Sequence, residues 1–119
     1  SFKGFIDLIF RHEGRFYVVD YKSNHLGMHV EDYSASQLLT AMTHHHYLLQ
    51  AHLYVLALHR YLTLRLPGYR YEEHIGGYRY ACLRGMRPDA PGESVFSDRP
   101  SWACIEALDE AMQHAGRST

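Results

Sequence analysis

The stretch that decides the fold runs from residue 4 to residue 22 and reads GFIDLIFRHEGRFYVVDYK. Its two halves, residues 4–11 and 15–22, are rich in aromatic and β-branched side chains, which favour extended strands. Between the halves, His12-Glu13-Gly14 is a turn signal. The stretch therefore predicts a β-hairpin, with a two- or four-residue loop centred on Glu13-Gly14.

The register of this hairpin decides which side chains share a face. With the loop centred on Glu13-Gly14, the numbers of opposing residues sum to 27, so Asp7 lies opposite Asp20. Side chains alternate between the two faces of a strand with a period of two, and Lys22 therefore shares the face of both acids. The other face is apolar, and we expect it to pack on the core: Ile6, Leu8, Phe10, Tyr17 and Val19.

Two carboxylates opposite each other destabilise a sheet, because their Cβ atoms would lie only about 4.5–5.5 Å apart. The neighbours of Asp7 and Asp20 are apolar, which strengthens the repulsion. Three arrangements would offset it: the acids share a proton, Lys22 neutralises one of them, or a divalent cation bridges both. Carboxylate oxygens suit Mg²⁺ or Mn²⁺, and a lysine beside the metal can orient a water or stabilise charge on a phosphate. A simple Asp–Lys ion pair with the second acid in solvent fits the pattern equally well.

Beyond the hairpin, residues 34–66 change to helical spacing. Ser34 and Gln37 form a capping-box signature at the start, and Pro67-Gly68 ends the segment. The segment is long for one helix, so we expect a break near His44-His45-His46 into two helices. Its apolar residues recur three or four apart: Leu38, Leu39, Met42, Leu49, Leu53, Leu56, Ala57 and Leu64.

The last third of the chain predicts one more strand and one more helix. Residues 78–83 read as a strand, and residues 87–100 read as a loop because they hold three prolines and a glycine. Ser101 caps a final helix through about His114, with three residues facing inward: Ile105, Leu108 and Met112. The order strand, strand, helices, strand, helix predicts a mixed α/β domain with helices packed on a small sheet.

Composition places the chain among soluble globular proteins. At 119 residues, with 46% hydrophobic and 21% charged residues, it suits one domain with its own core. No apolar run approaches the ~20 residues of a membrane span, so no membrane partner is expected. Cys82 and Cys104 stand apart and read as reduced thiols. The ten histidines show no ligand spacing, and the consecutive His44-His45-His46 cannot converge on one ion, so no zinc site is predicted.

The charge distribution has two readings. The net charge is −1, yet between residues 60 and 87 arginines outnumber the two acids Glu72 and Glu73: Arg60, Arg65, Arg70, Arg79, Arg84 and Arg87. Such a stretch can bind a polyanion or can be a solvated face. Arg79 and Arg84 are speculative DNA contacts. Tyrosines also recur every seven residues along the long helix, a spacing more typical of a packed stripe than of base stacking: Tyr47, Tyr54 and Tyr61.

These residues carry a resemblance to a known family. Gly4-Phe5-Ile6-Asp7, followed by residues 19–24 (VDYKSN), resembles the PD-(D/E)xK nuclease superfamily. Three further segments are similar, in the same order, to the nuclease domain of the exonuclease V beta-subunit family, the RecB-type helicase–nucleases: residues 47–54 (YLLQAHLY) continuing into 56–62 (LALHRYL), residues 74–77 (HIGG), and residues 80–86 (YACLRGM). The resemblance covers nearly the whole chain.

The resemblance implies a fold and a set of site residues. The fold is a restriction-endonuclease-like α/β core, a small mixed sheet with flanking helices. Asp7 and Asp20 would be the carboxylate ligands of Mg²⁺, for which Mn²⁺ can substitute, and the main-chain carbonyl of Tyr21 a further ligand. Lys22 would position or activate the attacking water and help to stabilise the pentacovalent phosphate.

The resemblance also implies a reaction and a setting. Gln50 and Tyr54, neighbours on one helix face, would support the site or touch the DNA backbone. The reaction is Mg²⁺-dependent hydrolysis of DNA that leaves a 5′-phosphate. The enzyme would be an exodeoxyribonuclease within a bacterial cytoplasmic helicase–nuclease complex, which processes double-strand DNA ends for recombinational repair together with other subunits.

Residues 1–119 would then be a single nuclease domain cut from a longer chain. In the family, a histidine on a helix before the first strand also binds the metal, and ATP binds in the helicase portion. We expect both to lie outside this chain, together with the N-terminal helix of the core, which would leave the isolated chain weakly active or inactive. The alternative is a non-catalytic DNA-binding or subunit-scaffolding module on the same fold. Such modules usually lose an acid or the lysine, and here all three are present.

Overall fold

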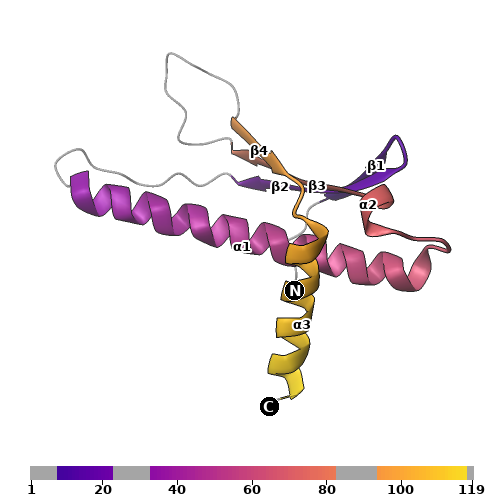
Figure 1. Cartoon of the computed structure of the whole chain (residues 1–119). Coiled ribbons are helices and arrows are strands. Elements are labelled where there is room, and N and C mark those ends of the chain that lie inside the picture. The colour runs from indigo at the N-terminus through magenta and orange to yellow at the C-terminus, as the bar shows by residue number, and fades with distance from the viewer. Residues whose placement is uncertain (1–7, 23–32, 83–93, 118–119) are drawn as a thin grey trace.

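A computed structural model describes residues 8–22, 33–82 and 94–117 of the chain. Its elements follow one another in this order: β1 (Leu8–His12), β2 (Arg15–Lys22), α1 (Tyr33–Arg65), α2 (Tyr71–His74), β3 (Ile75–Cys82), β4 (Ser94–Asp98) and α3 (Trp102–Arg117) (Figure 1). The strands form one sheet in the order β1-β2-β3-β4. The central pair β2–β3 is parallel and both outer pairs are antiparallel. The predicted α/β fold with a small mixed sheet and flanking helices is confirmed.

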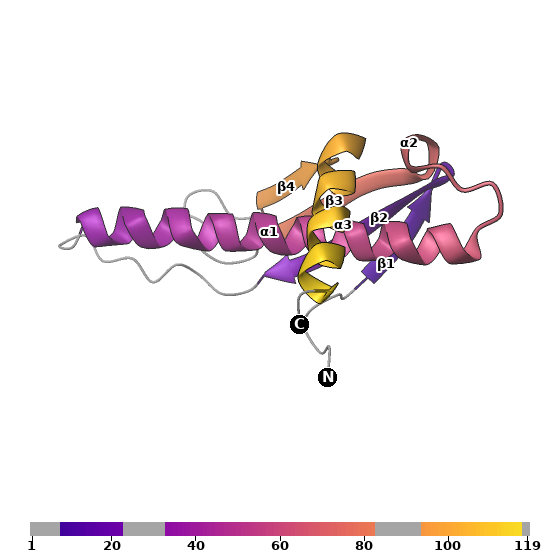
Figure 2. The same ribbon diagram turned by 60° about the horizontal axis from the view of Figure 1, so that its bottom comes forward.

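The helices pack in a layer against this sheet. Helix α1 runs along one face of the sheet, and α3 crosses α1 near the middle of its length (Figures 1 and 2). The buried core lies between α1 and the two central strands, and Ile105 brings α3 into it. None of the helices in the described ranges combines the length and the apolar character that a bilayer crossing needs.

The hairpin forms in the predicted register. Strands β1 and β2 pair from Leu8 opposite Val19 to His12 opposite Arg15, so paired numbers sum to 27. The loop is the two residues Glu13-Gly14, with φ of 52° and 80°. Two successive positive φ angles are typical of the type I′ turn, whose twist matches that of the flanking strands. Asp7 lies outside the described residues, so its predicted pairing with Asp20 stays a prediction.

The sheet face that packs against α1 is not the predicted one. Val18 and Asp20 are both 0% exposed, and Phe16 packs against the same core. Phe10 and Tyr17, which we expected in the core, instead stack on each other on the opposite face, with ring centroids 4.9 Å apart. Val19, a third residue of the predicted face, is buried as expected, at 9% exposed. Both faces of the hairpin carry apolar residues, and only the docking of a helix decides between them. As a consequence, Asp20 points into the layer between sheet and helix.

The expected break in the long helix is wrong. Helix α1 is continuous over 33 residues, through His44-His45-His46. Sharp kinks arise mainly at proline, at glycine or where a group inserts into the hydrogen-bond ladder, and α1 contains neither of those residues. The helix does end where predicted, because Pro67-Gly68 follows it and Gly68 takes a φ of 75°.

The buried stripe of α1 differs from the apolar stripe that the sequence indicated. Four of the buried residues recur at spacings of four, three and four: Ala51, Val55, Leu58 and Leu62. Leu56, which we placed inward, is also buried, at 3% exposed. Leu49 and Leu64, which we placed inward, are 55% and 82% exposed. Tyr47 packs against the core as expected of a packed stripe. Tyr54, which the resemblance assigned to the site instead, packs there too, whereas Tyr61 is 54% exposed. Leucine is common on both sides of this helix, so the identity of the residues could not select the buried side.

The prediction of a loop over residues 87–100 is wrong for residues 94–98. Residues 94–98 form β4, which pairs antiparallel with β3 from Cys82–Ser94 to Tyr78–Asp98. The prolines that suggested a loop stand at positions 88, 91 and 100, outside the strand. Proline disrupts a ladder only where it removes a needed donor, so these positions do not prevent an edge strand.

Helix α3 begins as predicted but is anchored at one end only. The Ser101 hydroxyl accepts a hydrogen bond from the backbone N–H of Cys104 at 3.0 Å, which is an N-terminal cap. Ile105 is 0% exposed and Leu108 packs against the core. Met112, the third residue that we expected inward, is 46% exposed. The C-terminal part of α3 extends away from α1 (Figure 1).

Substitutions at these positions should separate the anchored and unanchored parts of α3. Replacing Ile105 with alanine is expected to lower the free energy of unfolding by about 2–5 kcal/mol, because it leaves a cavity between α1 and α3. Replacing Met112 with alanine should change it by less than ~0.5 kcal/mol, the usual scale for an exposed site. Urea unfolding followed by far-ultraviolet circular dichroism measures both. A large loss for Met112→Ala would contradict the exposed position of that side chain.

Candidate active site

The carboxylate of Asp20 lies inside the protein. Asp20 is 0% exposed, and it is the one charged residue among the buried side chains of the described part of the chain. It sits on the central strand β2, where the parallel ladder pairs it with Tyr80 of β3. Removing a carboxylate from water is costly unless its charge is compensated. A buried acid on a central strand therefore marks a site that the fold keeps for a function.

Tyr80 joins Asp20 to the long helix. Its hydroxyl donates a hydrogen bond to Oε1 of Gln50 on α1, over 3.4 Å. Its ring meets the ring of Tyr47 edge-on, with centroids 6.3 Å apart. Burial raises the pKa of Tyr80 well above its usual range, and the negative charge of Asp20 raises it further. The hydroxyl therefore stays protonated and acts as a hydrogen-bond donor beside the acid.

The structure brings together three of the residues that the resemblance indicated. Gln50 and Tyr54 lie four apart on α1, as predicted for neighbours on one face. Gln50 accepts the Tyr80 hydrogen bond, and Tyr54 lies close enough to raise the pKa of Tyr80. Asp20, Gln50 and Tyr54 thus all lie near one residue, Tyr80. The sequence did not mark Tyr80 as a site residue. It stood with Tyr78 in a predicted strand, but its neighbour across the sheet depends on the parallel pairing of β2 with β3.

For the other predicted site residues, the structure gives at most their position on a strand. Tyr21 and Lys22 are the last residues of β2, where they pair with Ala81 and Cys82 of β3. Asp7 precedes the described residues. Within the described ranges, no three side chains of His, Cys, Asp or Glu gather as a metal site. The donors that β2 does offer at this point, a buried carboxylate and neighbouring main-chain carbonyls, are hard oxygen ligands that fit Mg²⁺ or Mn²⁺ rather than a metal that prefers sulfur.

The arginines of the basic stretch do not gather at Asp20. Arg79 pairs with Val19, so it lies on the opposite face of the sheet, where its guanidinium stands over the ring of Tyr17 at 4.8 Å. Arg60 donates a hydrogen bond from Nε to Asp109 of α3 at 2.6 Å. Arg84, the other speculative DNA contact, lies outside the described residues. The arginines that the structure describes therefore form separate local contacts rather than one basic surface beside the acid.

A buried acid on a central strand of a small mixed sheet, with a lysine two residues later, agrees with the family to which the sequence points. The chain belongs to the PD-(D/E)XK nuclease superfamily, whose model matches residues 1–114.

The individual relatives are subunits of one bacterial enzyme. The chain is 49% identical over 108 residues to the RecBCD enzyme subunit RecB of Escherichia coli K12, a match that covers 91% of this chain and 9% of that subunit. It is 50% identical over 107 residues to RecB of Haemophilus influenzae, covering 90% and 9%, and 42% identical over 116 residues to RecB of Mycobacterium tuberculosis, covering 92% and 11%. The chain thus spans about a tenth of the length of these relatives. The resemblance of the sequence to RecB-type proteins is confirmed.

Proposed function

We propose that this chain is a Mg²⁺-dependent DNA nuclease domain that hydrolyses phosphodiester bonds, with Asp7, Asp20 and Lys22 as its reactive centre. The observation that carries the proposal is the complete burial of Asp20 beside Tyr80 on the central strand. A protein that used this acid only for solubility would leave it in water, because burial of a charge is costly. In a chain of a nuclease superfamily, a carboxylate on the central strand beside Tyr80 is suited to binding a divalent metal ion.

Asp7, Asp20 and the main-chain carbonyl of Tyr21 would hold the metal. The described ladder starts at Leu8 opposite Val19, and this is the register from which the pairing of Asp7 with Asp20 was predicted. Bound there, Mg²⁺ would supply positive charge to the phosphate under attack and lower the pKa of a bound water, and Mn²⁺ would substitute for it.

The remaining groups would orient the reactants. Lys22 would hold the attacking water and stabilise the negative charge that develops on the phosphate. The hydrogen bond from Tyr80 to Gln50 ties β3 to α1 and would keep the wall behind Asp20 rigid. With Tyr54, these groups would support the site or contact the DNA backbone. Cleavage would leave a 5′-phosphate.

The similarity to RecB subunits supports a setting for this activity. The domain would act as an exodeoxyribonuclease within a bacterial cytoplasmic helicase–nuclease, in complex with other subunits, and process double-strand DNA ends for recombinational repair. ATP would be used by a helicase portion rather than by the residues described above.

A metal-removal experiment tests the function. The protein in its full natural length, with its partner subunits, is incubated with 5′-labelled linear duplex DNA and ATP. We expect release of short labelled products with Mg²⁺, loss of at least ~99% of this release with EDTA, and recovery with Mn²⁺. The new ends should require phosphatase treatment before a kinase can label them. Closed circular duplex serves as the control for an exonuclease.

The result also decides between catalysis and the alternative. DNA binding without cleavage under every metal condition would identify a non-catalytic DNA-binding or scaffolding module. Cleavage that persists in EDTA would contradict the metal-dependent mechanism.

A further inference from the structure

A pocket lies at the other end of the sheet from Asp20. It has a volume of about 330 Å³ and is formed where α1 ends and α2 and α3 begin, chiefly by His59, Tyr69, Arg70, Tyr71, Glu72 and Trp102. The adjoining start of β3, Ile75, pairs with Phe16, four residues before Asp20 on β2. At ~3.3 Å per residue, the start of β3 that adjoins the pocket is about 13 Å along the sheet from the acid. The pocket is therefore a separate site.

The walls of the pocket are aromatic rings held in place by hydrogen bonds. The ring of His59 lies 5.4 Å from that of Tyr69 and 5.3 Å from that of Trp102, between centroids. Nδ1 of His59 shares a hydrogen bond with the Tyr69 hydroxyl at 2.6 Å. Burial raises the pKa of Tyr71 to about 12, and its protonated hydroxyl donates to the carbonyl of Pro100 at 2.6 Å. Trp102 remains 38% exposed, so a flat ligand can reach its ring.

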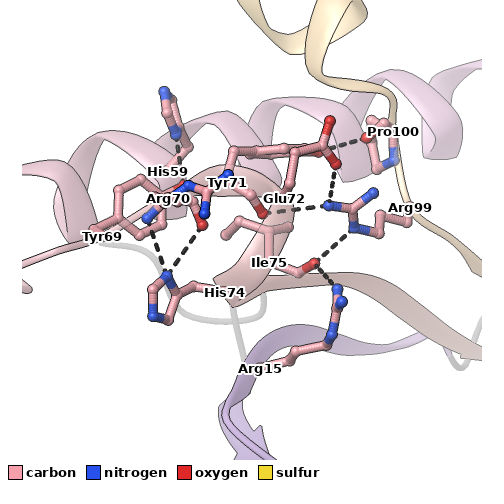
Figure 3. Close-up of polar contacts among 10 residues, drawn as sticks. All are labelled: Arg15, His59, Tyr69, Arg70, Tyr71, Glu72, His74, Ile75, Arg99 and Pro100. Carbon is pink, nitrogen blue, oxygen red and sulfur yellow. Dashed lines mark hydrogen bonds and ion pairs between the residues drawn. The ribbon is translucent and has the colours of Figure 1, made fainter.

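The charges around the pocket favour an anionic partner over a cationic one. The carboxylate of Glu72 already forms an ion pair with Arg99 at 2.8 Å (Figure 3). The Arg99 guanidinium also stands over the Tyr71 ring at 5.1 Å, the position that a bound cation would take. Burial lowers the pKa of His59, which keeps its ring neutral near pH 7.

Arg70, at the rim of the pocket, carries a positive charge that is available to a ligand. Its side chain is 72% exposed and reaches Glu73 only at 4.0 Å. An exposed ion pair of this length contributes little free energy, so the guanidinium can turn to a ligand. Apolar aromatic walls with an available guanidinium at the rim suit a flat ring that carries a phosphate.

We propose that this pocket binds an unpaired base of a single DNA strand, with the base stacked on Trp102 and an adjacent phosphate facing Arg70. The choice of nucleic acid as the ligand rests on the proposed function. Stacking on an aromatic ring accepts any base, because every base presents a π-face. Inside a duplex, neighbouring base pairs cover both faces, so an unpaired base binds preferentially. The site holds a strand away from the reactive centre.

Tryptophan fluorescence tests the proposal directly, since Trp102 is the single tryptophan of the 119 residues. Oligo-dT of about ten nucleotides is titrated into the protein in EDTA, where no metal-dependent cleavage occurs. We expect saturable quenching by oligo-dT and at least ~tenfold weaker binding of a blunt hairpin duplex. Absence of quenching, equal affinity for the duplex, or quenching by choline chloride instead of oligo-dT would each overturn the proposal.

Two pairs of variants assign the contacts. The slope of the logarithm of the binding constant against the logarithm of the salt concentration counts the phosphate contacts. Arg70→Ala should reduce this slope by about one, and Arg117→Ala, at the far end of α3, should leave it unchanged. Binding by variants that lack the tryptophan is measured from the fluorescence anisotropy of labelled oligo-dT. Trp102→Leu should bind oligo-dT about tenfold more weakly than the wild type, and Trp102→Phe should retain most of the wild-type affinity. Equal binding by the Leu and Phe variants would exclude stacking.

The experiment also separates this proposal from the proposed function. Cleavage with Mg²⁺ but no quenching by oligo-dT would remove the base-binding pocket alone. Quenching by oligo-dT with residues 1–119, while the full-length protein with its partner subunits never cleaves DNA, would keep the pocket and remove the nuclease.

Discussion

Replacement of Asp20 by asparagine is expected to lower the rate of DNA cleavage by at least about a thousandfold, the scale on which loss of one group directed at the transition state acts. An amide keeps the shape of the side chain but carries no charge, so it would bind Mg²⁺ poorly. Asp20 is 0% exposed, and a neutral amide is less costly to bury than a carboxylate. The metal-free variant should keep a cooperative urea transition, which would show that the loss of cleavage is not a loss of the fold.

Two further variants complete this test. Glu110→Gln removes an exposed acid on α3 and should leave cleavage unchanged. Lys22→Ala should abolish turnover while calorimetry still detects Mg²⁺ binding, because the lysine acts on water and phosphate rather than on the metal. If Asp20→Asn cleaved DNA at the wild-type rate, the acid would have no place in the reaction.

Replacement of Gly77 by alanine is expected to cost about 4 kcal/mol of stability, the sum of backbone strain and overpacking. Gly77 has a φ of 110°, where side chains other than hydrogen are strained. A Cβ at this position would also overlap the carbonyl oxygen of Asp98 and stand 3.0 Å from Cα of Arg99. Both atoms belong to the backbone at the end of β4, which cannot turn away as a side chain can. Strand β4 would therefore have to shift relative to β3.

Gly14 offers a matched control for this effect. It also has a positive φ, of 80°, but a Cβ there would meet no atom within 4 Å. Gly14→Ala should therefore cost only the backbone strain, about 1 kcal/mol. Urea unfolding of the two variants measures the difference. Equal losses would show that the close approach of Asp98 to Gly77 does not contribute.

The sequence indicated those site residues whose chemical type is unusual for their surroundings. An acid and a lysine two apart within an apolar strand drew attention to Asp20 and Lys22, and the family resemblance added Gln50 and Tyr54. Tyr80 was missed because it is one of ten tyrosines, and its position beside Asp20 arises from a parallel pairing between strands separated by more than fifty residues.

Local signals in the sequence were sufficient for the hairpin register, the end of α1 and the start of α3. Each depends on backbone angles and hydrogen bonds within a few residues, as at Glu13-Gly14, Pro67-Gly68 and Ser101. Tertiary structure alone decided which face of the hairpin is buried and that residues 94–98 become a strand. Those outcomes are choices between alternatives of similar local free energy, and the choice is made by α1 and β3, which reach the hairpin and the edge of the sheet only when the chain is folded.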